Sequence, residues 1–412
     1  MRFWFTLLLA LAASAANAAD LPHAWVQFVA SGGLEVRAIV GPGMKCPVVL
    51  SGQNPLTSVV RAEPTEAYPI QVCATPVPPG AGQLTANGLA LPAMPKQIRR
   101  VAIIGDTGCR MKGTFVQDCN DPAAWPFSTV ARLVGGRKPD IVIHVGDYHY
   151  RESACPTDRP GCAGSPFGDN WAVWQKDMFN PIDPLLPVAP FVFARGNHEL
   201  CERGGKGWFH ILDAYPSTAC RNLTDPYTLF IGPLTLSMLD SATADDQKAD
   251  PKMVPVYTEH LKALYAQSRP GSWLVTHRPI YAYAQGSSVP AGATTNATLQ
   301  AAMAEPIPAN IAMILSGHIH SFMSYEFAGA RPSQLVVGES GDASDEITNP
   351  LTPGKMIAGL PIKRGFGLGD YGYAMAHAVQ GGWDVTVYSI TDKALARCAL
   401  RGRGIHCRPT KR

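Results

Sequence analysis

Five apolar segments of the chain each end in a cluster of polar residues, and no other feature of the sequence restricts the fold as strongly. Patterns typical of helices lie between them, at residues 128–135, 171–178 and 257–268. Strands that alternate with helices predict a layered α/β core, in which functional side chains gather where the strands end. The five segments are RRVAIIGDTG, PDIVIHVGDYHY, PFVFARGNHE, SWLVTHRP and NIAMILSGHIH.

The polar clusters supply side chains that bind metal ions. Oxygen and imidazole donors in this mixture suit a pair of first-row transition metals. Two such ions, about 3.5–4 Å apart and bridged by one carboxylate, can hold an attacking hydroxide and neutralise a phosphoryl group. The donors at the five strand ends are Asp106, Asp147, Asn197, His277, His318 and His320.

The order of these motifs resembles that of the calcineurin-like metallophosphoesterases, over roughly residues 98–345, and most of all that of the purple acid phosphatases. Most of the superfamily begins with Asp-x-His, whereas this chain has GDTG. The purple enzymes replace the missing histidine with the tyrosine of G-D-x-x-Y, and this chain has Gly146-Asp147-Tyr148-His149-Tyr150. The resemblance implies a four-layer αββα metallophosphatase sandwich with a small N-terminal β domain.

The resemblance also implies a set of metal ligands, and every position of the purple pattern is filled. A phenolate beside carboxylates suits Fe(III), and a tight turn after Asp147 would bring Tyr150 to the same ion. The alternatives are core packing for Tyr150, a cap for Asp106, a turn for Asn197 and a core imidazole for His277. The Fe(III) ligands would be Asp106, Asp147, Tyr150 and His320, and Fe(II), Zn(II) or Mn(II) would bind Asp147, Asn197, His277 and His318.

Catalytic and substrate-binding residues are expected beside these ligands. In the family the histidine of G-N-H-E, here His198, contacts the phosphate or the leaving oxygen, and Glu199 would orient it. An exposed Glu199 without a role is the alternative. We expect Tyr148 in the core and His149 at the substrate. Arg195 and Arg278 flank the motifs, and either phosphate binding or structural ion pairing would explain them.

The implied activity is that of an acid phosphatase, which hydrolyses phosphomonoesters by attack of a metal-bound hydroxide and releases inorganic phosphate. One alternative is a dinuclear phosphodiesterase or nucleotide-cleaving enzyme with a structural Tyr150. Another is an inactive phosphate-binding or interaction protein. The acidic segment VVGESGDASDE, where the family has a glycine-rich loop, departs from a phosphate-friendly surface.

The N-terminus indicates export. One arginine, a short apolar stretch and Ala16-Asn17-Ala18 form a secretory signal at residues 1–18, cleaved after Ala18 or Ala19. Its alanine-rich character fits a bacterial protein in the periplasm or outside the cell. No later segment is apolar enough to span a membrane. Retention of Met1 in the intact mass would contradict this prediction.

The cysteines, the domain ranges and the net charge give three further expectations. Ten cysteines in an exported chain predict disulfides, and pairing of sequence neighbours is one hypothesis, against a mixture of free and paired thiols. Residues 19–95 read as a β-rich domain and linker, and residues 96–412 as the catalytic domain with antiparallel strands at its end. A net charge of +3 does not support a nucleic-acid surface. The neighbour pairs are Cys46–Cys73, Cys109–Cys119, Cys155–Cys162, Cys201–Cys220 and Cys398–Cys407.

Overall fold

The computed structural model describes residues 23–283, 294–303, 306–345, 347 and 351–410, and two large sheets form its centre. The first has eleven strands, in the spatial order β27 (Gly404–Pro409), β26 (Ala394–Arg401), β25 (Gly382–Ser389), β24 (Gly372–Val379), β9 (Arg100–Ile104), β12 (Ile141–His144), β13 (Phe191–Phe193), β1 (His23–Phe28), β2 (Leu34–Val40), β6 (Gln71–Val77) and β5 (Val59–Ala62). The second has eight, in the order β14 (Tyr227–Ile231), β15 (Leu234–Met238), β16 (Ser272–Val275), β19 (Ile311–Ser316), β21 (Ser333–Val337), β20 (Phe322–Phe327), β23 (Leu360–Leu368) and β22 (Met356–Ile357).

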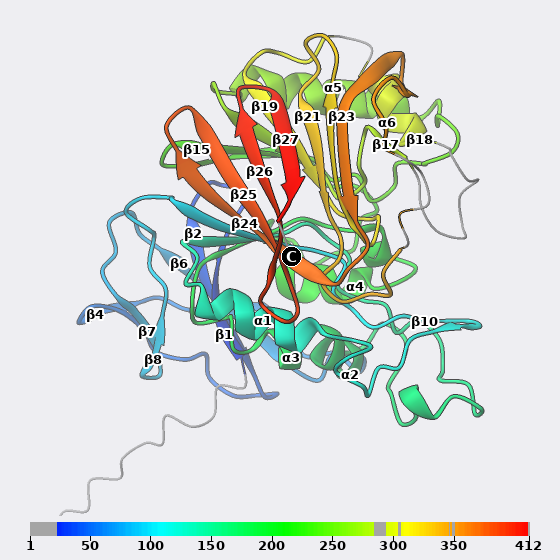
Figure 1. Cartoon of the computed structure of the whole chain (residues 1–412). Helices are drawn as coiled ribbons and strands as arrows, with labels where there is room; N and C mark the ends of the chain where they lie inside the picture. The colour runs from blue at the N-terminus through cyan, green and yellow to red at the C-terminus, as the bar shows by residue number, and fades with distance from the viewer. Residues whose placement is uncertain (1–22, 284–293, 304–305, 346, 348–350, 411–412) are drawn as a thin grey trace, which may run out of the picture.

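The two sheets pack face to face, and helices cover their outer faces (Figure 1). Alternation along β9 explains this arrangement, because Val101 and Ile103 point into the core between the sheets and Ala102 and Ile104 point outward. One outer face packs against α1 (Phe127–Gly136), α2 (Trp171–Trp174), the π-helical segment η2 (Gln175–Phe179) and α3 (Asn180–Ile182). The other packs against α5 (Met253–Gln267) and α6 (Ala297–Ala302). The predicted αββα layers are confirmed.

The first sheet joins segments from both ends of the chain. Strand β1 runs parallel to β13 through Gln27 and Phe191, so four N-terminal strands extend the sheet that carries the motifs. At the other end β24 pairs antiparallel with β9. A separate four-stranded sheet lies to one side (Figure 1), with the order β4 (Asn54–Leu56), β3 (Val49–Ser51), β7 (Leu84–Ala86) and β8 (Leu89–Leu91). The domain boundary between residues 95 and 96 stays a prediction.

Smaller elements complete the described chain. Two short antiparallel strand pairs join β10 (Met111–Lys112) to β11 (Phe115–Val116) and β17 (Ala282–Tyr283) to β18 (Thr294–Thr295). The remaining single turns are η1 (Pro160–Cys162), η3 (Asn197–Glu199), α4 (Gly205–Gly207) and η4 (Trp208–Leu212). Among the described residues, no helix combines the length and apolar character needed to cross a bilayer. The predicted signal at residues 1–18 lies outside the described residues.

All five disulfides predicted from sequence neighbours are formed, and no described cysteine is free. Two of them, Cys109–Cys119 and Cys155–Cys162, form a small apolar cluster with Met111 beside the metal-binding motifs. Such bonds reduce the entropy of the unfolded chain and are typical of oxidising compartments.

One buried acid opposes folding at neutral pH. Glu339 is fully buried after β21, and neither of its carboxylate oxygens has a hydrogen-bond partner. Burial raises its pKa to about 8, above its ordinary value of 4.5, although the nearby backbone N–H groups of Glu339 and Gly338 act in the opposite sense. The native state therefore keeps its proton while the unfolded chain loses it, and the free energy of unfolding falls as the pH rises from 4.5 toward 8.

The substitution Glu339→Gln tests this effect, because it retains the shape of the protonated acid. We expect Glu339→Gln to unfold with a free energy close to that of the parent near pH 5 and higher by about 2–5 kcal/mol near pH 8. Urea unfolding of metal-stripped protein at both pH values measures the difference. An equal effect of the substitution at both pH values would contradict this account.

Candidate metal centre

The polar clusters follow strands of both sheets. Asp106 follows β9 and Asp147 follows β12, while His277 and His318 follow β16 and β19 of the second sheet. Within each sheet these strands are parallel, so their carboxyl ends meet at one edge. The backbone N–H of His318 donates to both carboxylate oxygens of Asp106, at 3.0 Å each, and so joins the two sheets.

Tyr150 lies at the centre of the first group of predicted ligands. Its hydroxyl is 2.9 Å from Oδ2 of Asp147, 3.2 Å from Oδ1 of Asp106 and 3.0 Å from Nε2 of His320. The tyrosine is 1% exposed, and its hydroxyl points at polar atoms of three predicted ligands. A packing role alone does not explain this orientation.

The second group of predicted ligands shares Asp147. Nε2 of His277 is 3.1 Å from Oδ2 of Asp147 and 3.1 Å from Oδ1 of Asn197. Asp147, His277 and His318 each offer one ligand atom, and these three atoms lie within 4.8 Å of one another. The structure thus brings all seven predicted ligands together in two groups that meet at one carboxylate.

The backbone is strained at three of the predicted ligands. Three of the seven non-glycine residues with positive φ in the described chain are Asp106 (54°), Asp147 (58°) and His318 (72°). Such conformations cost of order 1 kcal/mol each and persist where the surroundings fix them. Gly196 is required for a different reason, because its φ is negative but a Cβ at this position would collide with the carboxylate of Asp147.

The buried carboxylates of Asp106 and Asp147 show that the set of predicted ligands suits cations. Burial and the neighbouring Asp147 raise the pKa of Asp106 well above its usual range. Asp147 is equally buried, yet the charges of His277 and His198 hold its pKa well below its usual range. Two adjacent carboxylates cannot both stay ionised in this setting without positive charge nearby. Metal ions bound by these carboxylates, imidazoles and the phenol would supply that charge.

Comparison with known proteins identifies the family. The model of the calcineurin-like phosphoesterases matches residues 99–322, more than half of the chain. The chain belongs to the calcineurin-like phosphoesterase family. It is accordingly a metal-dependent phosphoester hydrolase, and this family implies a dinuclear metal centre. No curated protein matches the chain.

Solved structures support the fold. A purple acid phosphatase, PPD1, from seeds of yellow lupin (Lupinus luteus) shares 15% identity, with a TM-score of 0.57 over 90% of this chain and 72% of its own. PhoD shares 12% identity, with a TM-score of 0.54 over 95% of this chain and 92% of its own. The resemblance noted in the sequence is thereby confirmed at the level of fold.

In this phosphoesterase Glu199 anchors a loop. Its carboxylate is fully buried and accepts hydrogen bonds from four backbone N–H groups, so it is not an exposed residue. Among the described contacts, none joins this carboxylate to the ring of His198. Burial and Asp147 raise its pKa to about 8, and backbone donors act in the opposite sense. The four donors belong to Asp147 (3.2 Å), Tyr148 (2.8 Å), His149 (3.1 Å) and Gly196 (3.0 Å).

His198 has a different carboxylate partner, which the sequence did not indicate. Its Nδ1 is 2.6 Å from Oε1 of Glu152, and the guanidinium of Arg203 pairs with the same carboxylate. The ring also lies 3.8 Å, between centroids, from the ring of Tyr150. Glu152 and Arg203 line a hollow of about 370 Å³ that also contains His149 and Lys206. Neither His198 nor any predicted metal ligand lines this hollow, which reaches His198 only through its partners Glu152 and Arg203.

The residues predicted to bind substrate have internal partners. Arg195 is buried, donates to the carbonyl oxygen of Glu199 and pairs with Asp240 at 3.2 Å. These contacts are the structural ion pairing that was the alternative to phosphate binding. Arg278 pairs with Asp246. His149 is 1% exposed, and its Nε2 is 3.0 Å from the carbonyl oxygen of Gly168. Tyr148 is fully buried in the core, as expected.

Arg110 is a further arginine at the site, and it explains the acidic segment. Its guanidinium pairs with the buried Asp342 and lies 3.2 Å from Nδ1 of His320. Asp345 accepts from the backbone N–H of His320 at 3.1 Å. Two acidic residues of this segment, Asp342 and Asp345, therefore serve as partners of His320 and Arg110, and Asp342 presents no charge to solvent, while Glu346 lies outside the described residues.

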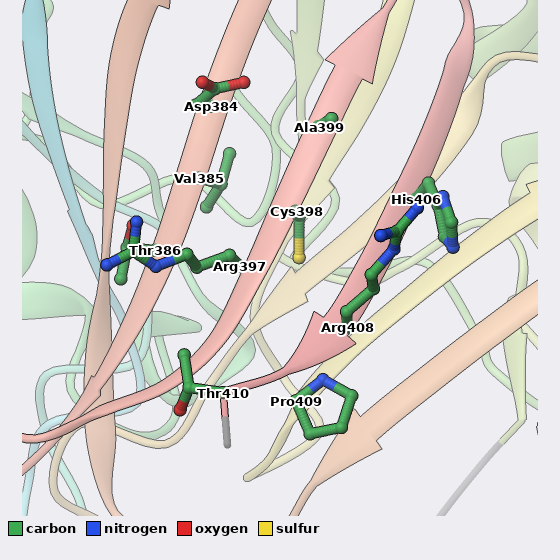
Figure 2. A pocket seen from close by; sticks show the side chains of 10 residues that line it. All are labelled: Asp384, Val385, Thr386, Arg397, Cys398, Ala399, His406, Arg408, Pro409 and Thr410. Atoms are coloured by element: carbon green, nitrogen blue, oxygen red, sulfur yellow. The ribbon is translucent and has the colours of Figure 1, made fainter.

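A larger hollow on the C-terminal strands has no convergent groups. It measures about 640 Å³ and is lined by residues of β25, β26 and β27 (Figure 2). Arg397 and Arg408 are partners in the strand register. Figure 2 shows Arg397 extending toward Thr386 and Arg408 toward His406, so the two guanidiniums point away from each other. None of the predicted site residues lines this hollow.

The anchoring role of Glu199 is testable by Glu199→Gln. An amide keeps only one acceptor oxygen and turns an NH₂ group toward backbone donors, which leaves buried N–H groups unpaired. We expect a loss of about 2–4 kcal/mol in the free energy of unfolding, measured by urea denaturation.

The matched control is Glu202→Gln, a change to an exposed glutamate three residues away. It should stay within about 0.5 kcal/mol of the parent. Equal stability of the two variants would show that the four N–H contacts of Glu199 carry little energy.

Proposed function

We propose that this phosphoesterase is an exported acid phosphatase that hydrolyses phosphomonoesters at an Fe(III)-containing two-metal centre. The proposal rests chiefly on one observation, the hydroxyl of Tyr150 within 3.2 Å of Asp106, Asp147 and His320. A phenolate among two carboxylates and an imidazole is a hard, anionic donor set, and such a set suits Fe(III). Fe(II), Zn(II) or Mn(II) would suit the group of Asp147, Asn197, His277 and His318.

The bound ions and the carboxylate of Asp147 have separate roles in the proposed hydrolysis. Bound metal ions supply Lewis acidity, which lowers the pKa of water and neutralises charge on a phosphoryl group. Asp147 belongs to both ligand groups and fixes their separation. Hydrolysis adds the oxygen of water to phosphorus and breaks the bond to the ester oxygen, which leaves as an alcohol after gaining a proton.

His198 is the residue placed to serve the leaving oxygen. Its Nδ1 is 2.6 Å from Glu152, and its Nε2 lies 2.8 Å from Nη2 of Arg203 and 3.9 Å from Oδ2 of Asp147. A neutral ring that donates through Nδ1 keeps its lone pair at Nε2, so only the doubly protonated ring, paired with Glu152, carries a proton at Nε2 that can pass to the ester oxygen as the bond to phosphorus breaks.

Export is supported by the covalent structure. Five disulfides suggest an oxidising environment, and none of the described cysteines is left as a thiol. The apolar N-terminal stretch and its Ala16-Asn17-Ala18 sequence fit a cleaved signal. A periplasmic or secreted location accounts for both observations.

A comparison of two substrates tests the proposed activity. We expect a higher kcat/KM for p-nitrophenyl phosphate than for bis-p-nitrophenyl phosphate, with a maximum at acid to neutral pH. A clear preference for the diester, or a maximum only above about pH 9, would favour a phosphodiesterase instead. Phosphate binding without turnover of either ester by the metal-loaded protein would favour a binding protein.

A further inference from the structure

Asp246 has no counterpart among the motifs, yet its carboxylate is saturated by donors beside the metal centre. Oδ2 pairs with Arg278 and lies 2.9 Å from Nε2 of His318. Oδ1 accepts from the hydroxyl of Thr295 and, at 2.8 Å, from Nδ2 of Asn296. Each oxygen thus has two donors, which leaves the carboxylate one orientation.

This contact determines which nitrogen of His318 is free. An imidazole that donates a proton to a carboxylate through Nε2 keeps the lone pair at Nδ1. Arg278 cannot accept that proton, because a guanidinium only donates, so Asp246 is the acceptor. The ring of His318 also meets the ring of His277, with centroids 5.2 Å apart. Asp246 is absent from the set formed by Asp147, His277 and His318, which marks it as an outer partner rather than a ligand.

We propose that Asp246 is a positioning residue of the metal centre, which holds His318 as the tautomer and in the orientation that present Nδ1 to the ion shared with Asp147 and His277. The inference rests on the proposed two-metal centre. A carboxylate behind a ligating histidine fixes the ring and raises its basicity, and loss of such a partner typically weakens metal binding about 10- to 100-fold.

The surroundings show that Asp246 is itself held in place. Asn296 is fully buried, donates to Asp246 and to the carbonyl oxygen of Ala244 at 2.9 Å, and caps α6 by accepting from Leu299 N–H at 2.8 Å. The start of α6 is therefore connected through one carboxylate to His318. The backbone of His318 has a positive φ of 72°, a strained conformation that persists only where neighbouring groups hold it. The contact with Asp246 is one of the contacts that hold this residue.

A zinc titration of metal-stripped protein, followed by competition with a chelator of known affinity, tests the proposal without measuring activity. We expect the parent to bind two ions. Asp246→Asn should weaken one of the two sites about 10- to 100-fold and leave the other unchanged. Added to His318→Gln, Asp246→Asn should weaken that site no further, because both changes act through the same ring.

The control is Asp245→Asn, which alters the preceding carboxylate in the same loop. That carboxylate accepts from the backbone N–H of Gln247 at 2.8 Å and of Lys248 at 2.9 Å. It should leave both affinities within about twofold of the parent. Thr295→Val removes one donor to Asp246 and should weaken the same site by a smaller factor, and it decides the matter if Asp246→Asn does not fold.

The outcomes separate the two proposals. Two sites of parental affinity in Asp246→Asn, or in Thr295→Val where that variant decides, would overturn the role of Asp246 alone. A parent that binds fewer than two ions would contradict the two-metal centre, and the role of Asp246 with it. Weakening of one site by Asp246→Asn and not by Asp245→Asn would support the proposal.

Discussion

The repulsion between the buried carboxylates of Asp106 and Asp147 is the constraint to which the rest of the site responds. Both side chains are almost fully buried, and they share the hydroxyl of Tyr150. Burial of adjacent carboxylates is costly unless positive charge and hydrogen-bond donors compensate. The loops that carry them contribute backbone donors, and cations bound between them would contribute the charge. Stability and metal binding are therefore properties of the same few residues.

Three histidines around these carboxylates share one arrangement, an imidazole beside an acid that also pairs with an arginine. His198 has Glu152 and Arg203, His318 has Asp246 and Arg278, and His320 has Asp342 and Arg110. Glu152 and Asp246 accept from the rings of His198 and His318, whereas Nδ1 of His320 donates to the carbonyl oxygen of Ala343 and lies 3.3 Å from Asp342. In all three cases the guanidinium offsets the charge of the carboxylate. The rings are thereby oriented without added net charge, so the charge of the central carboxylates remains available to cations.

The motifs at the strand ends predicted an α/β core, and the family that they resemble predicted the four layers and the approach of seven polar residues. Pairing of sequence neighbours predicted the disulfides. The sequence did not predict the partners of the histidines. Asp342 lies 232 positions from Arg110, and Asp246 lies 72 from His318, so no spacing rule connects them. The predicted substrate contacts of Arg195 and Arg278 rested on proximity in sequence, and the structure shows internal carboxylate partners for both. Folding brings such pairs together, and only the tertiary structure shows them.

The central claim is that Tyr150 is a metal ligand, and a visible absorption spectrum tests it most directly. Protein purified aerobically would be measured for absorption and for metal content on the same sample. A broad violet-to-purple charge-transfer band with iron bound is the predicted result, because a tyrosinate on Fe(III) produces it. A colourless protein that holds two metal ions would contradict the claim and leave Tyr150 a hydrogen-bonding residue of the core.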